Sequence, residues 1–221
     1  MKNSEFKIKR KSMRDEAYSV LQEWIISGVF EPNRKLKDSE LSEMLGISRT
    51  PIREALLKLE DEGLIQTKAN QWTMVAPISL EQAEHIYPIV ETLECLAIEQ
   101  GKANINDGVV SHLKEINEQF KDDLVKGRKE EAFQSDMKFH NMIINLAQNE
   151  ELARILKNLK LKIKRIEVYY FEGQESEIAS YHEHINIIES IRSRSISNLK
   201  DNLSKNWRGS LNRIRKKVNA D

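Results

Sequence analysis

Apolar residues in the first third of the chain recur every three or four positions, a spacing typical of helices that bury one face. The first such segment is Asp15–Gly28. The second is a short helix that Asp38 is expected to cap and Gly46 to end. The third begins at Ser48 as N-cap and continues to about residue 62, with a proline in its first turn. Three short helices with tight turns between them are therefore expected here.

Two β-prone stretches follow the third helix, at residues 64–65 and 73–75. They flank a polar tip at residues 68–71, so the pattern predicts a small hairpin. Helix, turn, helix and then a hairpin is the layout of a winged helix-turn-helix. We expect this domain to span residues 1–77.

Strand signals nearly vanish beyond residue 77, and helical spacing dominates from there. The chain has only 8 glycines and 4 prolines, too few breakers for a sandwich or barrel with frequent turns. These observations predict a mainly α protein, in which residues 78–221 form an all-helical antiparallel bundle. The expected helices are 80–102, 107–127, 130–147, 150–170, 176–193 and 195–217.

Composition excludes several classes of protein. No apolar run is long enough to span a membrane, and Met1–Arg14 lacks the apolar stretch of a secretion signal, so a cytoplasmic protein without a membrane partner is expected. Cys95 is the only cysteine, which excludes an intramolecular disulfide and a zinc site of paired thiolates. Lys and Arg number 35, as do Asp and Glu, a balance that argues against indiscriminate binding of polyanions.

The polar residues of the third helix and of the hairpin tip are candidates for DNA binding. Backbone N–H groups at a helix N-terminus attract phosphate, and this end of a recognition helix meets base edges in the major groove. An arginine there can read guanine O6 and N7 or clamp a phosphate, and the pattern also fits an ordinary solvated face. The candidates are Ser48, Arg49, Thr50 and Arg53 on the helix and Asn70 and Gln71 at the tip.

The uninterrupted string Gly-Ile-Ser-Arg-Thr-Pro-Ile-Arg-Glu-Ala-Leu at residues 46–56 closely resembles the DNA-binding domain of the GntR family of bacterial transcription regulators. The resemblance covers roughly residues 14–77. It implies that Arg49, Thr50 and Arg53 contact an operator in double-stranded DNA while the hairpin tip enters the minor groove. The chain departs from the family pattern at Asn33, Ser39 and Trp72, which affects the wing and the operator sequence.

Two ligand-type residues lie four apart in the third bundle helix. Asp136 and His140 project from one face, so a carboxylate and an imidazole could share one ion, with His184 as a third ligand from a facing helix. Alternatively, Asp136 and His140 form a buried hydrogen-bonded pair without metal. The other histidines, His85, His112 and His182, have no such partner and are expected at the surface.

The bundle resembles the FCD effector-binding domain of FadR-like GntR regulators. The signals are Leu93-Glu94, Asp136-x-x-Phe139-His140, Asn149-x-x-Leu152 and Glu183-His184. The resemblance implies a homodimer, a small-molecule effector and a divalent metal such as zinc or nickel, held by one aspartate and three histidines. Asn206 stands at the fourth ligand position, where an amide oxygen is a weaker ligand than imidazole.

Another departure concerns the effector. Many FCD domains have an arginine for an effector carboxylate where this chain has Val90, and whether Arg165 compensates is open. The sequence therefore predicts a DNA-binding transcription regulator that binds a palindromic operator as a homodimer, in the manner of a ligand-responsive repressor. The alternative is a metal-dependent enzyme using Asp136, His140 and His184 around an open coordination site, although no separate general base is recognisable.

Overall fold

The computed structural model describes residues 12–69, 71–170 and 174–220. The chain divides into two compact units, Met1–Ile78 and Ser79–Asp221. Residues 1–14 hold six basic residues and one acidic residue, and we expect them to form a basic N-terminal arm of the DNA-binding domain. Most of this segment lies outside the described residues. Among the helices of the described ranges, none is long and apolar enough to cross a membrane.

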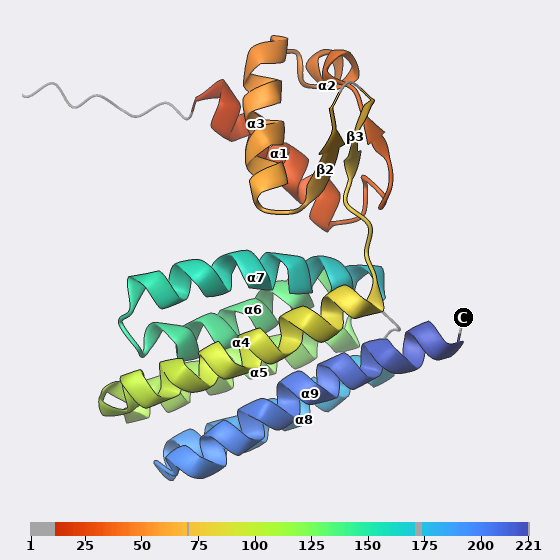
Figure 1. The fold of residues 1–221 in the computed structure, drawn as a ribbon. Coiled ribbons are helices and arrows are strands. Elements are labelled where there is room, and N and C mark those ends of the chain that lie inside the picture. Colours follow the sequence, from red (N-terminus) through yellow and green to blue (C-terminus); the bar gives the residue numbers. More distant parts are fainter. Residues whose placement is uncertain (1–11, 70, 171–173, 221) are drawn as a thin grey trace, which may run out of the picture. The chain divides into compact units, whose positions relative to one another are not determined.

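The first unit combines three helices with a small antiparallel sheet (Figure 1). The sheet has the strand order β1-β3-β2, and β2 and β3 pair from Ile65 opposite Val75 to Lys68 opposite Trp72. The two-residue β1, which the sequence did not predict, pairs with the far edge of β3. The elements are α1 Met13–Ile26, β1 Lys35–Leu36, α2 Asp38–Leu45, α3 Arg49–Asp61, β2 Ile65–Lys68 and β3 Trp72–Val75.

The ends of these helices follow the residues that were expected to set them, with one exception. Gly46 ends α2 in the left-handed conformation, with φ of 65°, and Ser48 is the N-cap of α3. The prediction that Asp38 caps α2 was wrong. Lys37 is the N-cap, and Asp38 is the first helical residue because its carboxylate pairs with Arg53 of α3 instead of turning back to the backbone.

One apolar core holds the first unit together. The three helices and the sheet each contribute fully buried side chains, so the core fixes α3 against α1 and α2 while leaving the opposite face of α3 in solvent. The buried members are Ala17, Leu21, Ile25, Phe30, Leu36, Leu41, Ile52, Ala55, Leu56, Leu59, Leu64, Ile65 and Val75.

In the described residues, the second unit consists of six long helices and one 3-10 turn, Lys102–Asn104. Figure 1 labels these helices α4 to α9. All six helices predicted from the spacing are confirmed, with ends that differ by a few residues. Helix α4 packs against α6, α7 and α9, and α5 packs against α6 and α8. Their bounds are α4 Leu80–Gly101, α5 Asp107–Val125, α6 Lys129–Asn145, α7 Glu150–Tyr169, α8 Gln174–Arg192 and α9 Ile196–Ala220.

The interior of this helical unit is not uniformly apolar. Glu94, Asn117, His140, Lys160 and His184 are each at most 2% exposed, and they come from five different helices. Because buried polar groups are costly unless they are paired, their partners define the site described next.

Candidate functional site

The predicted DNA-contacting residues of the first unit lie together on the exposed face of α3. Ser48, Arg49, Thr50 and Arg53 are all exposed, whereas Ile52 of the same turn is fully buried. The N-terminal end of α3 thus presents hydroxyl and guanidinium groups to solvent, together with the backbone N–H groups of its first turn. Gln71 at the hairpin tip is exposed as well, and Asn70 lies outside the described residues.

The two arginines of α3 differ in their surroundings. The Nε atom of Arg53 lies 2.5 Å from Oδ2 of Asp38 at the start of α2. In contrast, Arg49 has no ion pair or side-chain hydrogen bond within residues 12–69 and 71–78. The sequence did not indicate this difference, because Asp38 was assigned to a helix cap.

A polar cluster joins α1 to the C-terminal end of α3. The Tyr18 hydroxyl donates to Oε1 of Glu62 at 2.7 Å, and the Lys58 ammonium lies 3.5 Å from the centre of the Tyr18 ring. Burial raises the pKa of Tyr18 above its usual value, and the neighbouring Glu62 carboxylate raises it further. This cluster supplements the apolar core in fixing the direction of α3.

In the second unit, the three predicted metal ligands come together. Asp136 and His140 of α6 and His184 of α8 each offer one ligand atom, and these atoms lie within 4.8 Å of one another. Zinc binds such nitrogen and oxygen ligands at about 2.0–2.2 Å, so these atoms would have to move inward by less than about 1 Å to share one ion.

Hydrogen bonds fix which nitrogen of His140 faces the other ligands. Its Nδ1 lies 2.9 Å from Oε2 of Glu94, and a carboxylate only accepts, so Nδ1 carries the proton. Trp207 Nε1 donates to the same oxygen at 3.0 Å. Nε2 of His140 is therefore left with its lone pair. The alternative expected from the sequence, a hydrogen bond between Asp136 and His140, is replaced by this bond to Glu94.

His184 is oriented in the same way by an amide. Asn117 Nδ2 donates to the backbone carbonyl of Tyr181, so its Oδ1 faces Nδ1 of His184 at 2.9 Å and accepts that proton. Nε2 of His184 is buried without a hydrogen-bond partner, 3.4 Å from Oδ1 of Asp136. Two electron-rich atoms thus face each other, an arrangement that a bound cation would stabilise and that matches the tautomers a metal site needs.

The charges around the triad favour a neutral His184 and a shared cation. Burial lowers the pKa of His184 well below its usual value, which keeps this ring neutral and able to bind metal. Burial also raises the pKa of Asp136, against the opposing effect of nearby positive groups. For Glu94, burial alone would raise the pKa, but His140 and the Lys160 ammonium, 3.5 Å from Oε1, lower it overall. Glu94 is therefore an anion held between two cationic or proton-donating groups.

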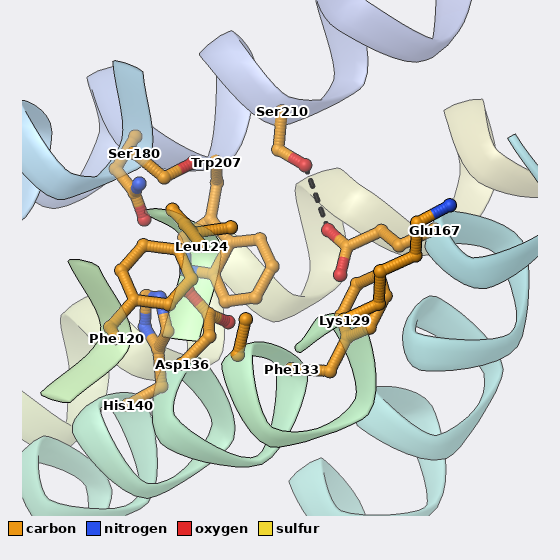
Figure 2. Close-up of a pocket in the computed structure, with 12 residues that line it drawn as sticks. Phe120, Leu124, Lys129, Phe133, Asp136, His140, Glu167, Ser180, Trp207 and Ser210 are labelled. Atoms are coloured by element: carbon orange, nitrogen blue, oxygen red, sulfur yellow. Dashed lines mark hydrogen bonds between the residues drawn. The ribbon is translucent and has the colours of Figure 1, made fainter. Parts of the chain in front are cut away.

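A pocket lies beside Asp136 and His140 of the triad, and Figure 2 shows both among its lining residues. It encloses about 410 Å³, including its solvent-open part, and Asp136, His140, Asn206 and Trp207 contribute to its lining. Asn206 donates its amide N–H to Glu183 at 2.9 Å, which leaves Oδ1 as its only metal-binding atom. Asn206 thus lines the same pocket as Asp136 and His140.

Glu167 of α7 also points into this pocket in Figure 2. Its Oε1 accepts from Tyr87 at 2.9 Å and from Ser210 at 2.8 Å. Val90, at the position where many FCD domains have an arginine for the effector, is fully buried. Arg165 is only 4% exposed and does not contribute to the pocket lining. The sequence therefore did not identify the ionisable group on this side of the pocket.

Several residues around the triad were missed by sequence reasoning. Asn117 and Lys160 each occupy a position within an apolar stripe, between Leu113 and Phe120 in α5 and between Leu156 and Ile163 in α7. A polar residue at such a position is a signal for a buried partner, and it could have been used here. His85, His112 and His182 are exposed, as predicted.

Comparison with known proteins agrees with both halves of this description. Residues 13–75 match the family model "Bacterial regulatory proteins, gntR family", and residues 85–203 match the FCD domain. The HTH-type transcriptional repressor RspR of Escherichia coli is 23% identical over 182 residues, which cover 82% of this chain and 80% of the relative. The Nta operon transcriptional regulator of Aminobacter aminovorans is 26% identical, over 76% of this chain and 79% of its own.

Solved structures share the fold. Escherichia coli McbR/YncC has a TM-score of 0.81 at 18% identity and covers 95% of this chain and 100% of its own. A GntR regulator from Rhodococcus has a TM-score of 0.80 at 16% identity, with 93% and 99% covered. The two family matches indicate a transcription regulator rather than a metal-dependent enzyme, the alternative considered from the sequence. With its winged helix and its helical unit both matched, this chain belongs to the GntR family of DNA-binding transcription regulators, in the group that carries an FCD domain.

Proposed function

We propose that this regulator is a ligand-responsive repressor that binds a palindromic operator as a homodimer and holds a divalent metal and a small-molecule effector in its helical unit. Residues 1–77 would bind DNA, and residues 78–221 would bind the effector and dimerise, in the cytoplasm where the operator lies. The observation that carries the regulatory part is the pocket beside Asp136, His140 and His184.

The operator contact is assigned to the exposed end of α3. Ser48, Arg49, Thr50 and Arg53 present hydrogen-bond donors in the arrangement of a recognition helix. We assign Gln71, which is exposed at the hairpin tip, and its neighbour in sequence Asn70 to the minor groove. A gel-shift series tests this assignment with the variants Arg49→Ala and Arg53→Ala. Both should weaken operator binding strongly, whereas Arg154→Ala on the helical unit should not. Unaltered binding by both α3 variants would remove the recognition helix from the mechanism.

The metal is assigned to Asp136, His140 and His184, with Asn206 as a weak or water-mediated fourth partner. Support comes from the unpaired Nε2 of His184, the imidazole of His140 and the Asp136 carboxylate, which converge there. When bound, a zinc or nickel ion would offer an open position to an oxygen donor of the effector. Glu94 would orient the imidazole of His140, and Asn117 that of His184, through their hydrogen bonds to Nδ1.

Elemental analysis of the protein as purified, and after reloading with zinc or nickel, tests the metal assignment. About one ion per chain is expected, and His140→Ala should lose it while remaining folded. His112→Ala is a matched control because this histidine is exposed on α5. Binding by His140→Ala as tight as by the unaltered chain would contradict the assignment.

Dimerisation through the helical unit is supported by apolar residues in solvent. On α4, Ile89 is 47% exposed and Leu96 is 43% exposed, and the seven-residue spacing puts both on one face. A two-fold axis at this face would relate two DNA-binding units and hence predicts a palindromic operator. Light scattering of Leu96→Glu should reveal monomers, while Val125→Glu on α5 should stay dimeric. A dimeric Leu96→Glu protein would exclude this face as the interface.

Regulation would follow from a shift between two arrangements of the DNA-binding units. The effector must bind one arrangement more tightly than the other, since equal affinity for both would leave DNA binding unchanged. Release of the operator on addition of the effector would mark the protein as a repressor that is induced.

A further inference from the structure

Arg53 and Asp38 form an ion pair that uses only one side of the guanidinium group. The Nε atom contacts the carboxylate at 2.5 Å, and the arginine side chain remains 65% exposed while that of Asp38 is 29% exposed. Within residues 12–69 and 71–78, no other hydrogen bond to the Arg53 side chain is found. The carboxylate therefore holds the inner edge of the guanidinium, and the two terminal nitrogens are available to a ligand.

The position of this pair in the fold matters for DNA binding. Asp38 opens α2, and Arg53 lies one turn after the N-terminus of α3, so the contact crosses between the two helices of the helix-turn-helix. Arg49 lies one turn earlier on the same face and has no comparable partner in the described part of this unit. The two arginines therefore differ in local net charge: Arg53 together with Asp38 is neutral, whereas Arg49 is a cation without such a partner.

Charge and geometry assign different DNA partners to the two arginines. A guanidinium held at Nε keeps its terminal fork, which matches O6 and N7 of guanine, and it loses less freedom on binding. The pair with Asp38 is neutral overall, so placing it against a phosphate would release little counterion and would bring a carboxylate close to the phosphate charge. Arg49 carries an uncompensated charge, as a phosphate contact requires.

We propose that Asp38 is a positioning residue that directs Arg53 to the edge of a guanine in the operator, while Arg49 binds a backbone phosphate. This inference rests on the proposed role of α3 in operator binding and resolves its chemistry. A carboxylate on a DNA-facing surface then contributes to sequence discrimination, although by charge alone it would oppose DNA binding.

The test begins with an operator selected from random duplexes by the full-length protein. Dissociation constants are then measured over a range of salt concentrations, on this operator and on duplexes with one base pair changed at a time. The variants are Arg53→Ala, Asp38→Ala, Asp38→Asn, Arg49→Ala and the double variant of Asp38 and Arg53. Glu40→Ala is the matched control, because Glu40 of α2 forms a different Arg–carboxylate pair, with Arg34 at 2.9 Å.

Arg53→Ala should lose discrimination at one G·C pair by about 5- to 150-fold with little change in salt dependence. Asp38→Ala should lose discrimination at the same pair and become more salt-dependent, since Arg53 is then an uncompensated cation. Asp38→Asn should retain most of the discrimination because an amide oxygen still accepts from Nε. Arg49→Ala should weaken binding on all duplexes alike and lower the salt slope by about 1. The double variant should show the same discrimination as Arg53→Ala, and Glu40→Ala should leave discrimination unchanged.

Two results would overturn the inference alone. One is a folded Asp38→Ala protein that discriminates between base pairs as well as the unaltered protein and Asp38→Asn do. The other is an Arg53→Ala protein that loses salt slope as Arg49→Ala does and keeps its discrimination. Failure to select any duplex would instead overturn the proposed DNA-binding role of α3, and this inference with it.

Discussion

Replacing Glu94 with glutamine removes one negative charge from the interior of the helical unit while keeping the size of the side chain. Glu94 is 0% exposed, and its Oε2 accepts from His140 and Trp207. The amide oxygen of glutamine can keep both bonds, because it has two lone pairs. Its NH2 group then faces Lys160 Nζ, which lies 3.5 Å from Oε1 in the unaltered protein. The buried cation thereby loses its counter-charge.

The size of the effect follows from these contacts. Removing one partner of a buried ion pair costs about 3–5 kcal/mol. Burial lowers the pKa of Lys160, so the lysine can lose its proton, and the two retained hydrogen bonds limit the loss further. We therefore expect the lower end of that range, about 3 kcal/mol, in the metal-free protein. A neutral partner also makes His140 a weaker ligand, by about 10- to 100-fold in metal affinity.

Two measurements on the same variant separate these effects. Urea unfolding in the presence of a chelator gives the stability of the metal-free protein, and competition with a coloured chelator gives the affinity for zinc and nickel. Glu91→Gln is a matched control, because Glu91 lies three positions earlier on α4 and pairs with Arg208 rather than with His140. A Glu94→Gln protein that unfolds at the same urea concentration and binds metal as tightly as the control would show that the Glu94 charge contributes to neither stability nor metal binding.

Three further predictions follow from other parts of the structure. Gly101→Ala should destabilise the helical unit by about 1–3 kcal/mol because its Cβ would lie 2.4 Å from the carbonyl carbon of Leu146. Gly209→Ala should cost less, because its Cβ would meet only the side-chain ends of Glu183 at 2.6 Å and Arg213 at 3.3 Å, which can move. Alanine favours both helices over glycine by about 1 kcal/mol, and thermal unfolding of both variants compares them. The pKa of Tyr18 is raised in the folded protein, so its contribution to stability is complete below about pH 10 and is lost at higher pH. The free energy of unfolding, measured with urea between about pH 9 and 11, should therefore fall more steeply for the unaltered protein than for Tyr18→Phe. Zinc or nickel at about 100 times its dissociation constant should stabilise the folded protein by about 2.7 kcal/mol in calorimetry, and a metal-independent transition would contradict the proposed site.

Local sequence patterns predicted most of the fold, for reasons that are visible in particular elements. The six bundle helices follow from apolar spacing because each buries one face. Gly46 and Ser48 marked the turn before α3 because their conformational and capping preferences are local. The strand β1 was missed because a two-residue strand has too little pattern to detect, and it exists only through its pairing with β3.

For the sites, the sequence by itself determined the residue types and their spacing along each helix. It placed Asp136 and His140 on one face, and the arginines of α3 on another, because helical periodicity depends only on neighbouring positions. Only the tertiary structure decided that Asp38 pairs with Arg53, that Glu94 and Asn117 set the tautomers of the two histidines, and that Lys160 neutralises the same buried carboxylate. These contacts join residues on different helices, and their strength depends on burial, a property that packing creates and that no local pattern specifies.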